Sequence, residues 1–154
     1  VMVVDLDSFK QVNDRAGHRQ GDELLKRCAA RIRANLPAGS AVARWGGDEF
    51  VVILEALACG EGAARRQVEQ TCRTVIAALQ PVYQLGAQRY RCPASIGACV
   101  YQPARTTGAE ALEMADRAMY EVKAMGNNSF RIGSAGRDDT VQALRPPLDL
   151  AAQG

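Results

Sequence analysis

The chain has 154 residues, of which 47% are hydrophobic and 23% charged, a composition typical of one soluble globular domain with a sizeable core. The formal net charge of +2 argues against nucleic-acid binding by bulk electrostatic attraction, and no apolar run approaches the length of a membrane span.

Cysteine and histidine usage limits the kinds of site that the chain can hold. Its five cysteines are odd in number and form no C-x-x-C pair, which is typical of reduced thiols rather than disulfides or zinc ligands. We therefore expect a cytoplasmic domain. The single histidine, His18, argues against a zinc or haem site. Position 1 is not a methionine and lies inside an apolar run, so we expect the chain to be a fragment of a longer protein.

The first element is a valine-rich apolar run at residues 1–6, which predicts a buried central strand. Asp5 lies near its end, and a carboxylate where a central strand leaves the sheet is a common ligand position. We interpret Asp5 as a ligand group. Asp7 or Ser8 can cap a short helix that follows, and for Asp7 this capping role is the preferred interpretation.

Apolar residues at helical spacing predict two long amphipathic helices, at residues 21–36 and 60–79. Between them, two short apolar runs flank the stretch Arg44-Trp45-Gly46-Gly47-Asp48-Glu49-Phe50. The paired glycines permit a primed hairpin turn and leave room for a ligand to approach the backbone. Adjacent acids at a hairpin tip are usually only solvated. Here a unit of strand, two helices and hairpin can pair its first strand with the hairpin, which would place Asp5 beside Asp48 and favours a metal-bound phosphate.

The second half of the chain supplies the remaining elements. A small hairpin is predicted at residues 82–91 and a core strand at 93–101, in which Gly97 indicates close approach by another element. Thr107 and Glu110 form a capping box for a helix that ends near residue 125. A closing edge strand is predicted at 129–132, and 134–154 are expected to be a flexible tail. The order predicts an α/β fold with a mixed five-stranded central sheet flanked by helices.

These motifs, in this order and at this spacing, resemble the GGDEF family of diguanylate cyclases. The residues that carry the resemblance are Asp5-Leu6-Asp7-Ser8-Phe9-Lys10, Asn13-Asp14, Gly17-His18, Gly21-Asp22, Arg44 to Phe50, Ser95-Ile96-Gly97, Ala115-Asp116 and Tyr120-Glu121-Val122-Lys123. The resemblance covers residues 1–132. It implies a domain at 1–133 that lacks the family's usual N-terminal helix. It also implies a fold similar to the nucleotide-cyclase and polymerase-palm (ferredoxin-like) domain.

The resemblance implies condensation of two GTP molecules into cyclic di-GMP, with release of two pyrophosphates. Attack of a hydroxyl on a phosphate needs a metal, and the resemblance implies Mg²⁺, or alternatively Mn²⁺, as the cofactor. Its ligands would be Asp5, Asp48 and the main-chain carbonyl of Leu6. Asp48, Lys10 and Glu49 would be the catalytic residues, although Glu49 could instead make a structural hydrogen bond beside the turn. Catalysis would need a homodimer, regulated by an upstream sensory domain.

The family's substrate contacts fall on further residues of this chain. Lys123 would bind the triphosphate, although a lysine in the last turn of a helix is also favoured by the helix dipole alone. Asn13 and Asp22 would read guanine, whose edge presents N–H donors, and this selects GTP over ATP. His18 would contact substrate; without the resemblance it is a turn histidine. Gly46 and Gly47 would line the nucleotide.

Besides the missing N-terminal helix, the sequence departs from the family pattern at two places. The Arg-x-x-Asp motif that binds inhibitory product in many members is replaced by Pro37-Ala38-Gly39-Ser40, so no product inhibition through that site is expected. Asn127 stands where the family usually has a phosphate-binding arginine, which is expected to reduce triphosphate affinity. Asn127 and the missing N-terminal helix leave an alternative to an active cyclase, namely a catalytically weak or inactive domain that binds GTP or cyclic di-GMP. An adenylate or guanylate cyclase-like enzyme fits the fold but not the guanine readers combined with the Gly-Gly-Asp-Glu-Phe turn.

Overall fold

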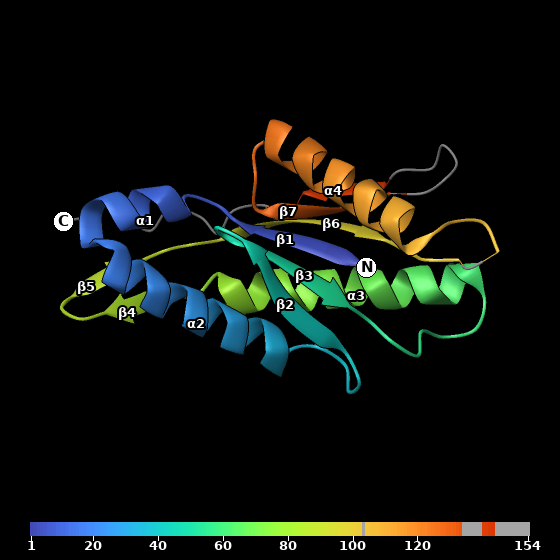
Figure 1. Cartoon of the computed structure of the whole chain (residues 1–154), viewed down its shortest axis with the longest axis horizontal. Coiled ribbons are helices and arrows are strands. Elements are labelled where there is room, and N and C mark those ends of the chain that lie inside the picture. The colour runs from blue at the N-terminus through green and yellow to red at the C-terminus, as the bar shows by residue number, and fades with distance from the viewer. Residues whose placement is uncertain (103, 134–139, 144–154) are drawn as a thin grey trace.

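A mixed sheet with helices on both faces forms the domain (Figure 1). The structure, a computed structural model, describes residues 1–102, 104–133 and 140–143. The elements, in chain order, are β1 (Met2–Leu6), α1 (Phe9–Ala16), α2 (His18–Ala34), β2 (Ala41–Gly46), β3 (Glu49–Ile53), α3 (Glu61–Leu79), β4 (Tyr83–Leu85), β5 (Gln88–Tyr90), β6 (Ala94–Cys99), α4 (Gly108–Ala124), β7 (Ser129–Gly133) and β8 (Thr140–Ala143). None of the described helices is long and apolar enough to cross a membrane.

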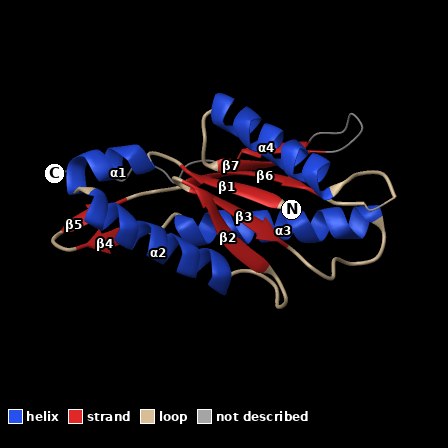
Figure 2. Ribbon diagram, in the orientation of Figure 1, coloured by secondary structure: helices blue, strands red, loops and turns tan. Residues whose placement is uncertain are grey.

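The main sheet has the strand order β2-β3-β1-β6-β7-β8, and β1 lies in its interior between β3 and β6. Only the β6–β7 pair is parallel among these ladders, which makes the sheet mixed, as the sequence predicted. The β4–β5 hairpin forms a separate two-stranded sheet. Figure 2 shows the strands of the main sheet side by side between the helices. The predicted α/β fold is therefore confirmed.

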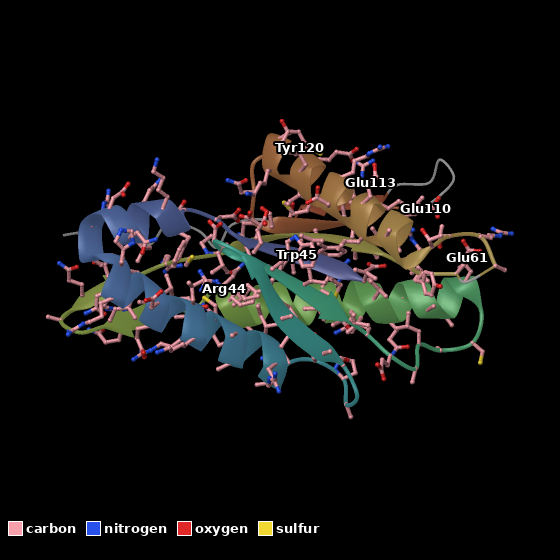
Figure 3. The ribbon with its side chains drawn as sticks, in the orientation of Figure 1. Arg44, Trp45, Glu61, Glu110, Glu113 and Tyr120 are labelled. Atoms are coloured by element: carbon pink, nitrogen blue, oxygen red, sulfur yellow. The ribbon has the colours of Figure 1, made fainter. Side chains whose placement is uncertain are left out.

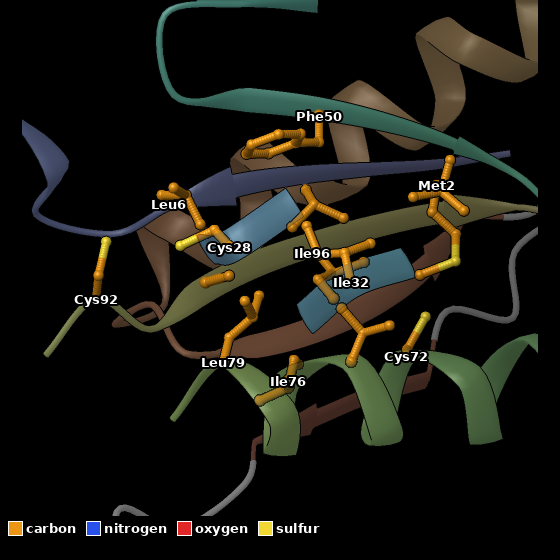
Figure 4. Close-up of a cluster of buried hydrophobic side chains, with 14 of the residues drawn as sticks. Met2, Leu6, Cys28, Ile32, Phe50, Cys72, Ile76, Leu79, Cys92 and Ile96 are labelled. Atoms are coloured by element: carbon orange, nitrogen blue, oxygen red, sulfur yellow. The ribbon is translucent and has the colours of Figure 1, made fainter. Parts of the chain in front are cut away.

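Successive side chains of β1 point to opposite faces of the sheet, and this alternation assigns the two helical layers. Met2, Val4 and Leu6 are buried in the larger core with side chains of α2 and α3 (Figure 4). Val3 faces the other side and packs in a smaller cluster with Ala115 of α4. Burying side chains of this size contributes about 1.5–3 kcal/mol each. By the same alternation, Asp5 lies on the α4 face.

The fit of α4 to the sheet depends on Gly97 of β6. A Cβ atom at Gly97 would overlap the backbone carbonyl of Ala115 and the backbone nitrogen of Met119. The helix backbone therefore rests directly on the strand. The close approach predicted from this glycine is confirmed.

Three details differ from the sequence predictions. Helix α2 begins at His18 rather than at residue 21. The main sheet has six strands rather than the predicted five, because β8 pairs antiparallel with β7, which was predicted to be the edge strand. β8 also lies within the region expected to be a tail, and the rest of residues 134–154 lies outside the described part of the chain.

Candidate functional site

The carboxyl end of β1 meets the β2–β3 hairpin. In the antiparallel register Asp5 lies opposite Glu49. The backbone N–H of Leu6 donates a 3.2 Å hydrogen bond to the carbonyl oxygen of Asp48, which holds the turn against the end of the strand. Asp48 and Glu49 are half-buried. The structure thus brings together the strand-end aspartate and the hairpin acids, as the sequence predicted.

Asp5 is buried, and its carboxylate pairs with a lysine from the opposite end of the chain. Its Oδ2 lies 2.6 Å from Nζ of Lys123, which stands in the last turn of α4. The side chain of Asp5 is 6% exposed and that of Lys123 is 36% exposed. Burial raises the pKa of Asp5, and the negative charges of Asp48 and Glu49 add to this, while Lys123 acts in the opposite direction. The carboxylates of Asp5, Asp48 and Glu49 therefore lie close together, and Lys123 is the cation paired with Asp5.

Asp7 does not cap α1, so the preferred interpretation of this residue was wrong. Ser8 occupies the N-cap position, with a φ of 67° and no side-chain capping hydrogen bond. The Asp7 carboxylate instead accepts hydrogen bonds from Oγ of Ser95, at 2.8 Å, and from the backbone N–H of Asn128, at 3.0 Å. Burial raises the pKa of Asp7 in spite of these donors. The contacts fasten the segment after α4 to the end of β1.

The hairpin turn is open on its outer side. Gly47 has a φ of 32°, and a Cβ atom there would meet nothing within 4 Å. At Gly46 the nearest atom to such a Cβ is Oε2 of Glu49, at 3.9 Å. Arg44 donates from Nε and from a terminal guanidinium nitrogen to the carbonyl oxygen of Gly47, at 3.0 and 2.7 Å. These bonds brace the turn and leave its backbone accessible to a ligand.

The expected guanine readers lie on α1 and the start of α2. Asn13 packs against Gly21, where an added Cβ would overlap its Oδ1 atom. That Oδ1 atom is buried and accepts no hydrogen bond within the described part of the chain. Lys10, His18 and Asp22 are exposed. Asp22 also lines a cavity of about 650 Å³ between α2 and β2, whose wall includes Phe50.

The donors at the end of β1 suit a magnesium ion. Among residues 1–102, 104–133 and 140–143, no group of three or more His, Cys, Asp or Glu side chains has the arrangement of a metal site. Magnesium bound with a nucleotide needs fewer protein ligands, because phosphates and waters complete its coordination. Asp5, Asp48 and the Leu6 carbonyl would be such a set, and the negative charges of Asp48 and Glu49 beside Asp5 would favour a divalent cation.

Two features of the site were not anticipated from the sequence. Ser95 and Asn128 donate hydrogen bonds to Asp7. The one sequence signal for a buried role of Asp7 is its position directly after a buried strand. Trp45 is 67% exposed and lies beside a cavity of about 480 Å³ between the hairpin and α4. Figure 3 shows Trp45 on the hairpin and Glu113 on α4.

Comparison with known proteins gives concordant matches. Residues 1–129 match the family model for the diguanylate cyclase GGDEF domain. The chain is 39% identical over 130 residues to the bifunctional diguanylate cyclase/cyclic di-GMP phosphodiesterase MucR of Pseudomonas aeruginosa, covering 84% of this chain and 18% of MucR. It is 38% identical over 133 residues to the diguanylate cyclase TpbB of the same species, covering 86% of this chain and 29% of TpbB. The chain thus spans less than a third of either relative.

Solved structures show the same fold. The isolated GGDEF domain of TpbB superposes with a TM-score of 0.78 at 36% identity, covering 86% of this chain and 75% of that one. The coiled coil and GGDEF domain of DgcB from Caulobacter crescentus, in complex with c-di-GMP, has a TM-score of 0.75 at 25% identity. That match covers 86% of this chain and 68% of the DgcB chain.

Proposed function

This chain belongs to the GGDEF family of diguanylate cyclases, and we propose that it condenses two GTP molecules into cyclic di-GMP with release of two pyrophosphates. The observation that carries the proposal is the meeting of buried Asp5, the hairpin acids and Lys123 at the end of β1. A nucleotidyl transfer needs carboxylates for a metal and a cation for phosphates, and both stand there.

Each residue at this meeting point has a proposed task. Asp5, Asp48 and the Leu6 carbonyl would hold Mg²⁺ or Mn²⁺, which when bound shields the triphosphate and lowers the pKa of the attacking hydroxyl. Lys123 binds the triphosphate, and Lys10 stabilises charge that develops in the transition state. Asp48 is also the proposed proton acceptor. A metal-bound carboxylate is a weak base, so the ligand role is its main one. Glu49 assists from its place opposite Asp5.

We propose that residues of α1 and of the start of α2 select the nucleotide base. Asn13 and Asp22 accept hydrogen bonds from the N–H groups on the edge of guanine, while adenine would leave the aspartate without a donor. Oδ1 of Asn13 is buried against Gly21 and accepts no hydrogen bond from described residues, so it gives up no such bond if the side chain turns to accept from guanine. His18 contacts the bound nucleotide, and Gly46 and Gly47 give its phosphates room at the turn.

Each domain holds one GTP, so catalysis requires a homodimer in which two half-sites face each other. A two-fold symmetric product fits a two-fold symmetric enzyme. We propose that the domain acts in the cytoplasm under the control of an upstream sensory region. Residues 37–40 carry neither the arginine nor the aspartate of the inhibitory motif, so product does not inhibit through that site.

One observation favours a second candidate function, a nucleotide-binding domain without turnover. Asn127 takes the place of the family's phosphate-binding arginine and adopts a left-handed conformation with a φ of 64°. An asparagine is shorter than an arginine and carries no charge, so the triphosphate loses one partner.

Incubation with GTP and Mg²⁺, with cyclic di-GMP measured by chromatography, tests the proposal. We expect product from the unaltered chain and none from Asp48→Ala, which should still bind guanine through Asn13 and Asp22. Glu55→Ala removes an exposed acid from a loop and serves as the matched control, with turnover retained. GTP binding without product in the unaltered chain would favour the second candidate, and absence of GTP binding would refute both.

A further inference from the structure

Two cations compete for the carboxylate of Asp5, the ammonium group of Lys123 and the proposed metal ion. In the structure Oδ2 of Asp5 is 2.6 Å from Nζ of Lys123, a close and mostly buried ion pair. Under the proposed function the same carboxylate also binds a divalent cation. An ammonium group and a metal ion on one carboxylate repel each other, and the burial of Asp5 strengthens that repulsion because water screens it poorly.

The two partners differ in their freedom to move. Asp5 lies on an interior strand that is hydrogen-bonded on both sides, opposite Glu49 of β3 and Ser95 of β6. The backbone of Lys123 is equally fixed, because α4 rests directly on β6 at Gly97. The lysine side chain, however, is 36% exposed and has a long flexible stem. If a metal takes the carboxylate, the ammonium group is the part that can swing away.

A nucleotide offers that ammonium group a new partner. When metal and triphosphate arrive together, the phosphates replace the carboxylate as the counter-ion of Lys123. When metal arrives alone, only water replaces the carboxylate beside the ammonium group, and the loss of the ion pair is less fully compensated. The cost of binding metal therefore depends on whether phosphate is present.

We propose that Lys123 guards the metal site: it neutralises Asp5 until a metal–nucleotide complex arrives, and then transfers from the carboxylate to the phosphates. This inference rests on the proposed metal-binding role of Asp5. It assigns Lys123 a task beyond holding the triphosphate, namely to weaken the binding of metal that comes without nucleotide.

The proposal predicts opposite effects of Lys123→Met on two ligands. Mn²⁺ without nucleotide, measured by electron paramagnetic resonance of the unbound ion, should bind about threefold more tightly or better, because its competitor is gone. GTP in the presence of Mn²⁺, measured by calorimetry at a temperature and time that prevent turnover, should bind about tenfold more weakly or worse. A lysine that serves only the triphosphate would leave the first measurement unchanged.

Three variants make the result decisive. Lys26→Met removes the same charge from the exposed face of α2 and should change Mn²⁺ affinity less than about twofold. Lys123→Arg keeps the charge and should keep nucleotide-free Mn²⁺ binding as weak as in the unaltered chain. Asp5→Asn should abolish that binding and so identifies the site. If Lys123→Met unfolds, as judged by circular dichroism, Lys123→Gln replaces it.

The possible failures are distinct. If Asp5→Asn abolishes Mn²⁺ binding but neither Lys123→Met nor Lys123→Gln tightens it, the guarding role is wrong and the proposed function stands. If Asp5→Asn leaves Mn²⁺ binding unchanged in every background, Asp5 is not a metal ligand. The guarding role then fails together with the metal-binding part of the proposed function.

Discussion

At the scale of the residue, the position of Gly97 has no room for any side chain. A methyl group there would overlap backbone atoms of Ala115 and Met119, and backbone cannot rotate away as a side chain can. We expect Gly97→Ala to lower the free energy of unfolding by about 1–3 kcal/mol or more, measured by urea denaturation. Gly62→Ala is the control, because its new Cβ would meet only the guanidinium of Arg66, at 3.5 Å. Because Gly62 is the second residue of α3, this change should alter stability by less than about 0.5–1 kcal/mol, and equal effects of the two changes would contradict this account.

The cysteines give a second prediction at this scale. Cys59 is exposed, whereas Cys28, Cys72, Cys92 and Cys99 are buried. Burial also raises the pKa of Cys72 to about 12, which suppresses its thiolate. With a chromogenic disulfide reagent at pH 8, we expect one thiol to react rapidly in the folded protein and the other four only after unfolding. Cys59→Ser should remove the fast phase, and a fast phase of several thiols would show that the core opens readily.

Single residues were also where sequence reasoning succeeded and failed most clearly. Gly97 was predictable because a glycine inside a core strand has few explanations besides a close neighbour. Asp7 was not, because its position before a helix equally suited a cap. Its actual donors, Ser95 and Asn128, are 88 and 121 residues away in sequence, and no local pattern reports such partners.

At the scale of the element, the N-terminus of α4 is a capping box. Oγ1 of Thr107 accepts from the backbone N–H of Glu110 at 3.2 Å, and the backbone N–H of Thr107 donates to Oε2 of Glu110 at 2.7 Å. The sequence predicted this box, because its four-residue pattern is complete within one turn of helix.

The box makes the stability of the protein depend on pH. The hydrogen bond from the Thr107 backbone, followed by that from its hydroxyl, lowers the pKa of Glu110 below its usual 4.5. A lowered carboxyl pKa stabilises the fold above the unfolded value, and this contribution is lost as pH falls through the folded one. Glu110→Gln should therefore reduce the melting temperature at pH 7, with the difference from the unaltered chain shrinking below pH 4.5. Glu113→Gln removes the same charge from the same helix outside the box and is the control, with a smaller expected effect on the melting temperature at pH 7.

Other element boundaries escaped prediction for a physical reason. The first turn of α2, from His18, is polar and lacks the apolar spacing that reveals a helix. β8 lies in a stretch without strong periodicity, and it joins the sheet by backbone pairing with β7, which depends little on the identity of the side chains. Periodicity reveals which elements bury a face, and it says little about elements whose order comes from backbone hydrogen bonds.

At the scale of the whole molecule, the sequence predicted the α/β class and the meeting of Asp5 with the hairpin, because a short connected unit can pair in few ways. The ion pair between Asp5 and Lys123 could not be predicted from the sequence. That contact depends on α4 packing on the face of the sheet opposite α2 and α3, and on the position along β6 at which α4 crosses that strand.

The proposed homodimer leads to a prediction at this scale. If each domain contributes one half-site, the rate per domain should rise with protein concentration and level off once dimers predominate. Cyclic di-GMP formation measured over a hundredfold dilution series should therefore fall more steeply than the protein concentration. A rate strictly proportional to concentration throughout would argue against the two-half-site mechanism, provided that sedimentation shows monomers at the lowest concentration.

The network around Asp7 also has a consequence for how the chain is made. The hydrogen-bond donors to its carboxylate, Ser95 and Asn128, are synthesised 88 and 121 residues later. During synthesis, chain emerges at about 5–20 residues per second, so the first strand spends several seconds without the groups that fasten it. The proposed nucleotide site, which shares that strand, can be completed only after Lys123 in the last turn of α4 has left the ribosome. A nascent chain stalled before Lys123 should therefore lack the proposed site, although β1 and the hairpin have already been synthesised.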